Sequence, residues 1–301
     1  MSAAALPLVS IGLPVYNSAR HLPKALDTFL AQTFGDFELV ISDNASTDGT
    51  EAICREYADR DARVRYHRQA SNIGAPRNWN AAFHAARGEF FKWSSGNDYC
   101  APEFLARCVE AMQARGDVVL CYGRTGLIDE DGRLLEVYEG DLDLPEASPS
   151  DRFARVRQGM DMNNAQQGLM RSDVLRRTRL DRLYPGGDIA LMAELALYGR
   201  FLRLPEVLLF RRQGPGAVMA SKSPAEVQRI YNPQARRPMK LLRGRFYWDH
   251  FVSVARAPIP LREKARAWTL AARFARYERD EIWRELRSLL PVGGNGAGRS
   301  A

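Results

Sequence analysis

The sequence has few cysteines, and they lack the patterns in which cysteine usually does chemistry. Its 301 residues contain Cys54, Cys100, Cys108 and Cys121, with no spacing typical of a metal site. They also lack the density of a small secreted protein held by disulfides. We therefore expect four reduced thiols that are mostly buried.

Long apolar runs are missing too. No segment approaches the roughly 20 apolar residues that a bilayer-spanning helix needs, and the N-terminus has no basic segment followed by an apolar signal core. We expect a globular cytoplasmic protein, at the inner face of the membrane if it docks there. The formal net charge of +7 favours acidic partners, such as phosphorylated small molecules, an anionic membrane or nucleic acid.

The sequence also lacks the glycine-rich loops that commonly bind phosphate groups. The first half contains neither GxGxxG nor GxxxxGK[ST], which argues against a dinucleotide oxidoreductase and a phosphate-loop ATPase. No internal repeat is visible. If a diphosphate binds here, a cation is the simplest remaining means of holding it.

The pattern that is present alternates short apolar strands with amphipathic helices. Strands are expected at 8–13, 37–42, 64–67 and 90–93, and helices at 22–34, from Asp48 onward, and at 76–87. This alternation predicts an α/β fold with a Rossmann-like, mostly parallel central sheet flanked by helices. Beyond it we expect a helix at 102–115, a strand at 118–122 and a hairpin turn at 129–132 before a strand at 134–137.

Two acidic side chains follow strands of this predicted sheet. Asp43 comes after the second strand and Asp98 after the fourth, and the carboxyl ends of parallel strands meet at one edge. A carboxylate at the position of Asp98 can hold a divalent cation or cap the helix that begins near Pro102. The residues alone leave both possibilities open.

Four ordered blocks carry a family resemblance. They are 14–17 (Pro-Val-Tyr-Asn), 43–50 (Asp-Asn-Ala-Ser-Thr-Asp-Gly-Thr), 72–78 (Asn-Ile-Gly, then Arg-Asn) and 88–98 (Gly-Glu-Phe leading to Asn-Asp). Over roughly residues 8–215 the chain resembles family-2 glycosyltransferases with the GT-A fold. The resemblance implies an inverting enzyme that moves a sugar from a nucleotide-diphosphate donor to a saccharide or lipid-linked hydroxyl acceptor, in bacterial polysaccharide, glycolipid or glycoconjugate synthesis.

The resemblance also implies a donor site. Asp43 would contact the nucleoside base, and Asp98 with Asn97 would hold Mg²⁺ or Mn²⁺ beside the diphosphate. The full set expected to bind the nucleotide is Pro14, Val15, Tyr16, Asn17, Asp43, Asn72, Gly74, Arg77, Ser95, Gly96 and Asn97.

The acidic turn departs from the family. The usual Asp-x-Asp-Asp is replaced here by 95–98 (Ser-Gly-Asn-Asp), so one carboxylate, Asp98, remains. Either Asp98 suffices with the diphosphate as co-ligand, or the donor binds with little help from a metal, or catalysis is impaired. The third alternative describes a catalytically silent module that binds sugar nucleotides or docks partners.

A second departure follows the last expected strand of the sheet. The family often has a histidine there, whereas this chain has Arg211 and Arg212. These two cations could complement the diphosphate, or they could simply be solvated.

Asp188 is the expected catalytic base. It lies at the start of a helix whose stripe includes Ile189, and the later Gly-Arg-Phe at 199–201 preserves the family's order around its base. The competing interpretation is a helix N-cap worth about 1 kcal/mol. Glu194 is expected on another face of the same helix.

Two stretches of the acceptor half are ambiguous. The acidic segment 139–150 is either a mobile loop over the cleft or a linker. Residues 163–171 predict a strand entering a helix at Ser172, with amides that bind either sugar hydroxyls or buried backbone.

The expected domains are a GT-A domain at 1–215, with a nucleotide-sugar half at about 8–125 and an acceptor half at 126–215, then a basic helical extension at 216–290 and a disordered tail at 291–301. The helices of the extension either lie on anionic lipid as a peripheral membrane contact or pack on their own domain with a solvated basic face. Nucleic acid is not expected as a partner. The sequence does not indicate an oligomeric state.

Overall fold

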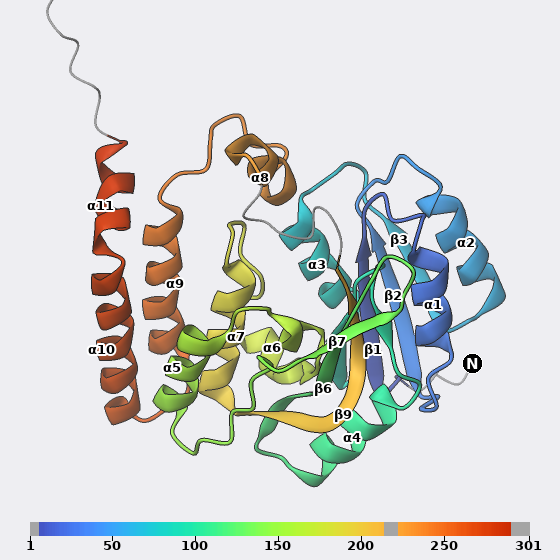
Figure 1. The fold of residues 1–301 in the computed structure, drawn as a ribbon, viewed down its shortest axis with the longest axis horizontal. Coiled ribbons are helices and arrows are strands. Elements are labelled where there is room, and N and C mark those ends of the chain that lie inside the picture. The colour runs from blue at the N-terminus through green and yellow to red at the C-terminus, as the bar shows by residue number, and fades with distance from the viewer. Residues whose placement is uncertain (1–5, 214–221, 290–301) are drawn as a thin grey trace, which may run out of the picture.

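The protein is built on a single nine-stranded sheet (Figure 1). The computed structural model describes residues 6–213 and 222–289. Along the sheet the strands follow the order β3 (Val64–Arg68), β2 (Phe37–Asp43), β1 (Val9–Val15), β4 (Phe90–Trp93), β8 (Leu169–Arg171), β6 (Val118–Ile128), β9 (Arg200–Arg212) and β5 (Tyr99–Cys100), and β7 (Leu134–Tyr138) pairs with β6.

The first four strands of this order are parallel, which brings their carboxyl ends to one edge. Val15 of β1 pairs with Asp43 of β2, and Asp43 in turn pairs with Arg68 of β3. On the other side of β1, Gly12 pairs with Trp93, the last residue of β4. The expectation that the turns after β2 and β4 share one edge is confirmed. The second half of the sheet is mixed, because β8, β5 and β7 all pair antiparallel.

Helices cover both faces of the sheet. Helices α1 (Leu22–Leu30), α2 (Thr50–Arg60) and α4 (Phe104–Ala114) bury their apolar sides in one core, and all four cysteines are free and buried. The opposite core takes side chains from α3 (Ala75–His84), α5 (Pro149–Gly159), α6 (Ser172–Arg177) and α7 (Gly187–Tyr198). Two apolar cores separated by a sheet are the layered arrangement that the alternating pattern predicts.

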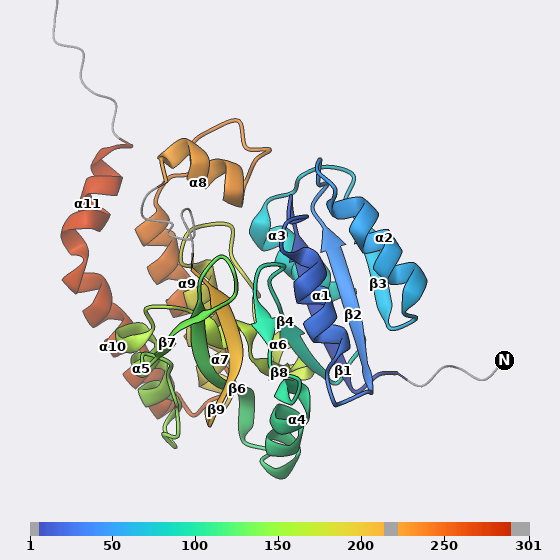
Figure 2. The ribbon, with the colours of Figure 1, turned by 45° about the vertical axis from the view of Figure 1, so that its right-hand side comes forward.

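Beyond the sheet the chain forms α8 (Pro224–Tyr231), α9 (Leu242–Arg256), α10 (Leu261–Tyr277) and α11 (Arg279–Arg287). Helix α9 packs on α7, and α10 packs on α5 and α9 through the fully buried Ala267 and Ala271. Helix α8 contacts α3, and both views show it apart from α10 and α11 (Figure 1 and Figure 2). In the part of the chain that is described, no helix is both long enough and apolar enough to cross a bilayer.

Two segments differ from the sequence-based expectations, and a third cannot be compared with them. The strand expected at 163–171 begins only at Leu169, because Asn164–Gln167 closes a 3-10 turn whose amide side chains are buried. Helix α5 was not expected. The acidic segment before it is tied to the sheet, since Leu144 is fully buried and bridges to Phe201. The expected tail at 291–301 lies outside the described residues.

A buried ion pair holds α7 to the loop that precedes it. Glu194 has no solvent exposure, and its Oε2 lies 2.8 Å from Nη2 of Arg182. Glu194 therefore faces the protein interior. A charge buried in this way destabilises the fold strongly when its partner is removed.

We expect Arg182→Met to lower the free energy of unfolding by about 3 kcal/mol, because Glu194 would remain charged without its partner. The double variant Arg182→Met/Glu194→Met removes both charges and should recover most of this loss. Urea unfolding measures both values. Equal losses in the single and double variants would contradict the assignment.

Candidate active site

A cavity of about 570 Å³ opens at the edge where the parallel strands end. Four residues of the expected nucleotide-binding set line it: Pro14, Val15, Tyr16 and Asn72. The structure adds a floor from β2 and α3, made of Asn44, Ala75, Asn78 and Trp79. It also adds a wall from α8 and its flanks, made of Lys222, Glu226, Arg229, Ile230 and Pro233.

Side-chain amides hold this floor in place. Asn44 Nδ2 donates to Asn72 Oδ1 at 3.0 Å, and Asn44 Oδ1 accepts from the backbone of Ile73 at 2.8 Å. Asn78 Nδ2 donates to the carbonyl of Ser42 at 2.8 Å. These short side chains cross-link the ends of the strands, so the cavity floor is preformed.

Asp43 organises the neighbouring turn. Its carboxylate is fully buried and accepts from Ser46 N at 2.9 Å, Tyr66 Oη at 2.7 Å and Arg68 Nη1 at 3.0 Å. Every one of these contacts is made with the protein itself, so the structure shows Asp43 positioning Asn44 at the cavity. Direct contact between Asp43 and a base stays a prediction.

Other members of the expected set surround the cavity without lining it. Asn17 has a positive φ of 49°, and its Oδ1 accepts from the backbone of Thr47 at 2.8 Å. Gly96 packs against Val15, since a Cβ there would lie 3.5 Å from a methyl group of Val15. Because Val15 lines the cavity, the turn at 95–97 lies beside the cavity.

Asp98 is buried beside this edge. Its Oδ1 accepts from the backbone of Arg212 at 3.0 Å and its Oδ2 from Gln167 Nε2 at 2.7 Å. Desolvation raises the pKa of Asp98, although both hydrogen bonds and the nearby charge of Arg211 oppose the rise. A cation bound next to Asp98 would stabilise its ionised carboxylate and so lower its pKa.

The residues around Asp98 fit a divalent cation that is shared with a ligand. The buried Oε1 of Gln167 has no hydrogen-bond partner, and Asn97 can offer a second neutral oxygen. Within the described residues no group of three or more acidic, histidine or cysteine side chains gathers into a cation site. Mg²⁺ commonly takes one or two carboxylates together with phosphate oxygens, and this donor set matches that arrangement.

The two arginines at the end of β9 have different surroundings. Arg211 Nη1 donates to Asn164 Oδ1 at 2.7 Å, close to Asp98. Arg212 is buried, and its guanidinium binds the carbonyls of Asp129 and Glu130 and the hydroxyl of Tyr99. These contacts fix Arg212 to the β6–β7 hairpin, so of the two, Arg211 is better placed for a diphosphate.

Asp188 lies in the first turn of α7, as expected. Its Oδ2 accepts from Asn163 Nδ2 at 3.0 Å. Burial raises the pKa of Asp181 and of Tyr231, and the charge of Asp188 adds to both shifts. Tyr231 follows Ile230 of the cavity wall on α8.

The 3-10 turn Asn164–Gln167 joins Asp98 to Asp188. Gln167, at one end of this turn, binds Asp98, and Asn163, just before its other end, binds Asp188. The segment 163–167 therefore links the surroundings of Asp98 to those of Asp188.

Sequence reasoning missed Asp181 and α8. Asp181 is half-buried, one of its oxygens is buried without a partner, and desolvation followed by the charge of Asp188 raises its pKa to about 8. No local pattern marks this residue, because its partner Asn80 binds its backbone from α3. The start of α8 could have been predicted from Ser223 and Glu226, which have the spacing of a capping box.

Asp181 should make stability depend on pH. Folding raises its pKa from 3.8 to about 8, so the folded chain keeps a proton that the unfolded chain releases, and stability falls as pH rises through this window. We expect Asp181→Asn to become more stable relative to the wild type by about 4 kcal/mol between pH 5 and pH 8.5. Urea unfolding at both pH values tests this. If the difference in unfolding free energy between the variant and the wild type were the same at both pH values, the raised pKa of Asp181 would be wrong.

Comparison with known proteins places these features in a family. The model of the family described as "Glycosyl transferase family 2" matches residues 10–176. An uncharacterized glycosyltransferase of Rickettsia felis is 34% identical over 143 residues, covering 46% of this chain and 23% of that protein. EpsJ of Bacillus subtilis, also an uncharacterized glycosyltransferase, is 36% identical over 117 residues, covering 38% of this chain and 34% of that protein.

A chondroitin synthase of Escherichia coli is 30% identical over 130 residues, covering 43% of this chain and 19% of that protein. The matched segments thus span from about a fifth to about a third of these three relatives.

Solved structures share the fold. TarS 1–349 of S. aureus in complex with UDP aligns with a TM-score of 0.61 at 18% identity, over 94% of this chain and 75% of that one. The mannosyltransferase PcManGT of Pyrobaculum calidifontis, in complex with GDP-Man and Mn²⁺, aligns with a TM-score of 0.52 at 18% identity, over 95% of this chain and 85% of that one. The expected GT-A fold is confirmed. With the family model covering more than half of its length, the chain belongs to glycosyl transferase family 2.

Proposed function

We propose that this enzyme moves a sugar from a nucleotide-diphosphate donor to a hydroxyl acceptor with inversion, in the synthesis of a bacterial polysaccharide, glycolipid or glycoconjugate. The observation that carries the proposal is the hydrogen bonding of the segment 163–167, in which Gln167 binds Asp98 and Asn163 binds Asp188. TarS with UDP-GlcNAc and PcManGT with GDP-Man support a nucleotide-sugar donor.

Asp188 acts as the base in this proposal. The acceptor hydroxyl loses its proton to the carboxylate as the hydroxyl oxygen attacks the anomeric carbon of the donor. Asn163 orients Asp188 through its 3.0 Å hydrogen bond. Asp181 keeps its proton at neutral pH, because its pKa lies near 8. Asp188 is therefore the negatively charged carboxylate of the two, and it accepts the proton of the acceptor hydroxyl.

The donor diphosphate lies between Asp98 and the cavity. A divalent cation, held by Asp98, Asn97 and Gln167 together with phosphate oxygens, would neutralise charge on the departing diphosphate. Arg211 adds a positive charge on the same side, next to Asp98. With one carboxylate in this turn, phosphate oxygens of the donor would have to complete the coordination of the cation.

Asp188→Asn should lower kcat by about 10²–10⁴-fold, because the amide cannot accept the proton. The dissociation constant of the donor should stay the same. The matched control is Asp173→Asn, since Asp173 also lies in the first turn of a helix, α6, but is exposed and binds Arg177. Donor turnover, measured as nucleoside diphosphate release in the presence of acceptor, separates base from helix cap.

Two outcomes would count against the proposal. Equal loss of activity in both variants would assign Asp188 a capping role. Donor binding without acceptor-dependent turnover in the wild type would favour a catalytically silent sugar-nucleotide-binding module.

The outer face of α10 and α11 supports a lipid-linked acceptor at an anionic membrane. Tyr277 is 92% exposed and Trp283 is 58% exposed, and they lie near the exposed Leu286 and Leu289. Interfacial helices combine apolar side chains with arginines. Among the described residues, no carboxylate forms an ion pair with the arginines of these helices at positions 262, 273, 276, 284 and 287.

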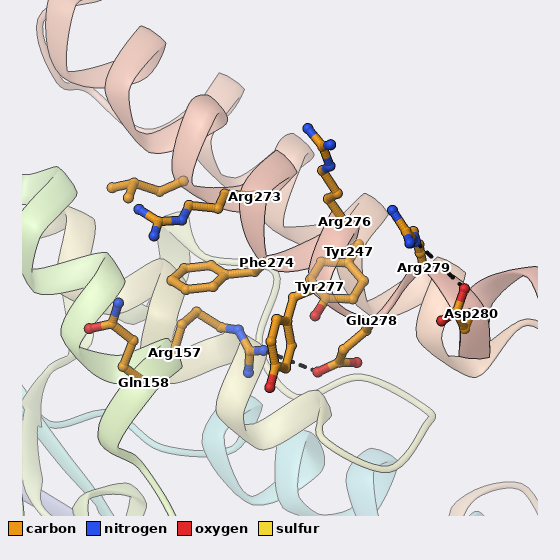
Figure 3. Close-up of a pocket in the computed structure, with 11 residues that line it drawn as sticks. Arg157, Gln158, Tyr247, Arg273, Phe274, Arg276, Tyr277, Glu278, Arg279 and Asp280 are labelled. Carbon is orange, nitrogen blue, oxygen red and sulfur yellow. Dashed lines mark ion pairs between the residues drawn. The ribbon is translucent and has the colours of Figure 1, made fainter.

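A second cavity, of about 750 Å³, indents this face (Figure 3). Its lining contains the cations Arg157, Arg273, Arg276 and Arg279. Arg157 lies over the ring of Phe246 at 4.6 Å, and its buried Nε has no hydrogen-bond partner. A lipid headgroup phosphate could satisfy this donor while the bilayer covers the exposed aromatic side chains.

We expect the wild type to bind vesicles that contain phosphatidylglycerol and to bind pure phosphatidylcholine vesicles weakly. Trp283→Ser/Leu286→Ser should lower the partition coefficient by about tenfold or more, because two apolar contacts are lost. The exposed Leu135→Ser on β7 is the control. Vesicle sedimentation measures binding. Equal wild-type binding to both lipids, or self-association that the double variant abolishes, would contradict membrane docking.

A further inference from the structure

Helix α8 is fastened to the nucleotide edge although it lies beyond the family-matched segment. Arg77 Nη1 donates to Asn232 Oδ1 at 3.1 Å, and Gln234 Nε2 donates to Ser71 Oγ at 3.1 Å. The contact is close at Gly74, where a Cβ would lie 2.6 Å from the carbonyl oxygen of Tyr231. The turn expected to contact the nucleotide is thus also the docking site of α8.

Two cations from α8 and its N-terminal flank line the resulting cavity. They are Lys222 and Arg229. Neither forms an ion pair with a carboxylate in residues 6–213 or 222–289. The one acidic residue beside them, Glu226, is engaged by the helix cap: its Oε2 accepts from Ser223 N at 2.8 Å and from Ser223 Oγ at 2.6 Å.

The opposite wall of the cavity carries little charge of its own. Its residues from β1, β2 and α3 are apolar, aromatic or amides: Pro14, Val15, Tyr16, Asn44, Asn72, Ala75, Asn78 and Trp79. The nearby acidic turn keeps one carboxylate and has the neutral Asn97 where the family usually has another. With one carboxylate fewer, this turn is expected to bind a divalent cation more weakly. A diphosphate bound here therefore needs positive charge from other side chains.

We propose that Lys222 and Arg229 bind the diphosphate of the donor and supply the positive charge that the shortened acidic turn cannot recruit. This inference rests on the proposed function. Both side chains reach the cavity from one wall, opposite the amide floor that faces the nucleoside. The ammonium group and the guanidinium group each donate hydrogen bonds to phosphate oxygens, and the guanidinium group can do so in pairs.

The test is calorimetric titration with UDP, GDP, ADP, CDP and dTDP and with the matching nucleosides, each in Mg²⁺ and in EDTA. Lys222→Gln/Arg229→Gln should raise the dissociation constant of the bound nucleoside diphosphate about tenfold or more in both buffers. Nucleoside affinity should not change. The charge-preserving variant Lys222→Arg/Arg229→Lys should retain most of the affinity for the diphosphate.

The matched control is Arg236→Gln/Arg237→Gln, which removes two exposed cations from the same segment that do not line the cavity. No residue of α8 is fully buried, so neither double variant should impair folding. Unchanged diphosphate affinity in Lys222→Gln/Arg229→Gln would overturn the inference and leave the donor class standing. A wild type that binds none of these nucleotides would overturn the donor class itself.

Discussion

The hydrogen bonds at the two ends of one short 3-10 turn hold the candidate active site together. Gln167 binds Asp98 and Asn163 binds Asp188, so the segment 163–167 sets the spacing between these two carboxylates. A buried lysine supports this turn from below. Lys92 Nζ donates to the carbonyl of Gln167 and lies 4.3 Å from the centre of the Phe104 ring. The hydrogen bonds of Gln167 with Asp98 and with Lys92 are buried and costly to break, so this end of the turn is held rigidly, whereas the bond between Asn163 and Asp188 is partly exposed.

This rigidity matters for the chemistry, since a base must lie at a fixed position relative to the bond that forms. The parallel strands position the nucleotide edge, and the antiparallel strand β8 brings the turn back beside β4. Donor and acceptor sides therefore come from different parts of the chain but share one hydrogen-bonded layer.

Much of the first half could be predicted from the sequence. Apolar runs followed by Asp43 and by Asp98 indicated strand ends, and parallel pairing then required those ends to meet. Asp188 at the start of α7 followed from the apolar stripe after it. These features depend on local periodicity and on the rules of sheet construction, which a single sequence displays.

What could not be predicted depends on contacts between distant segments. Lys92 looked like part of an apolar strand, and only the fold reveals that it supports Gln167. Asp181 gains its pKa near 8 from burial and from Asp188, neither of which a local pattern shows. The burial of Arg212 likewise follows from the path of the β6–β7 hairpin. The amides at 163–167 were ambiguous because strand and 3-10 turn can present the same polar side chains.

Glycine at position 74 has a consequence for how the cavity can vary among related proteins. Since Gly74 admits the backbone of Tyr231 at close range, a helix from outside the matched segment of the family becomes part of the nucleotide wall. Related chains with the same sheet but a different helix at this place would have a differently shaped cavity. The lining of the cavity can then vary in a short segment without changes to the buried core.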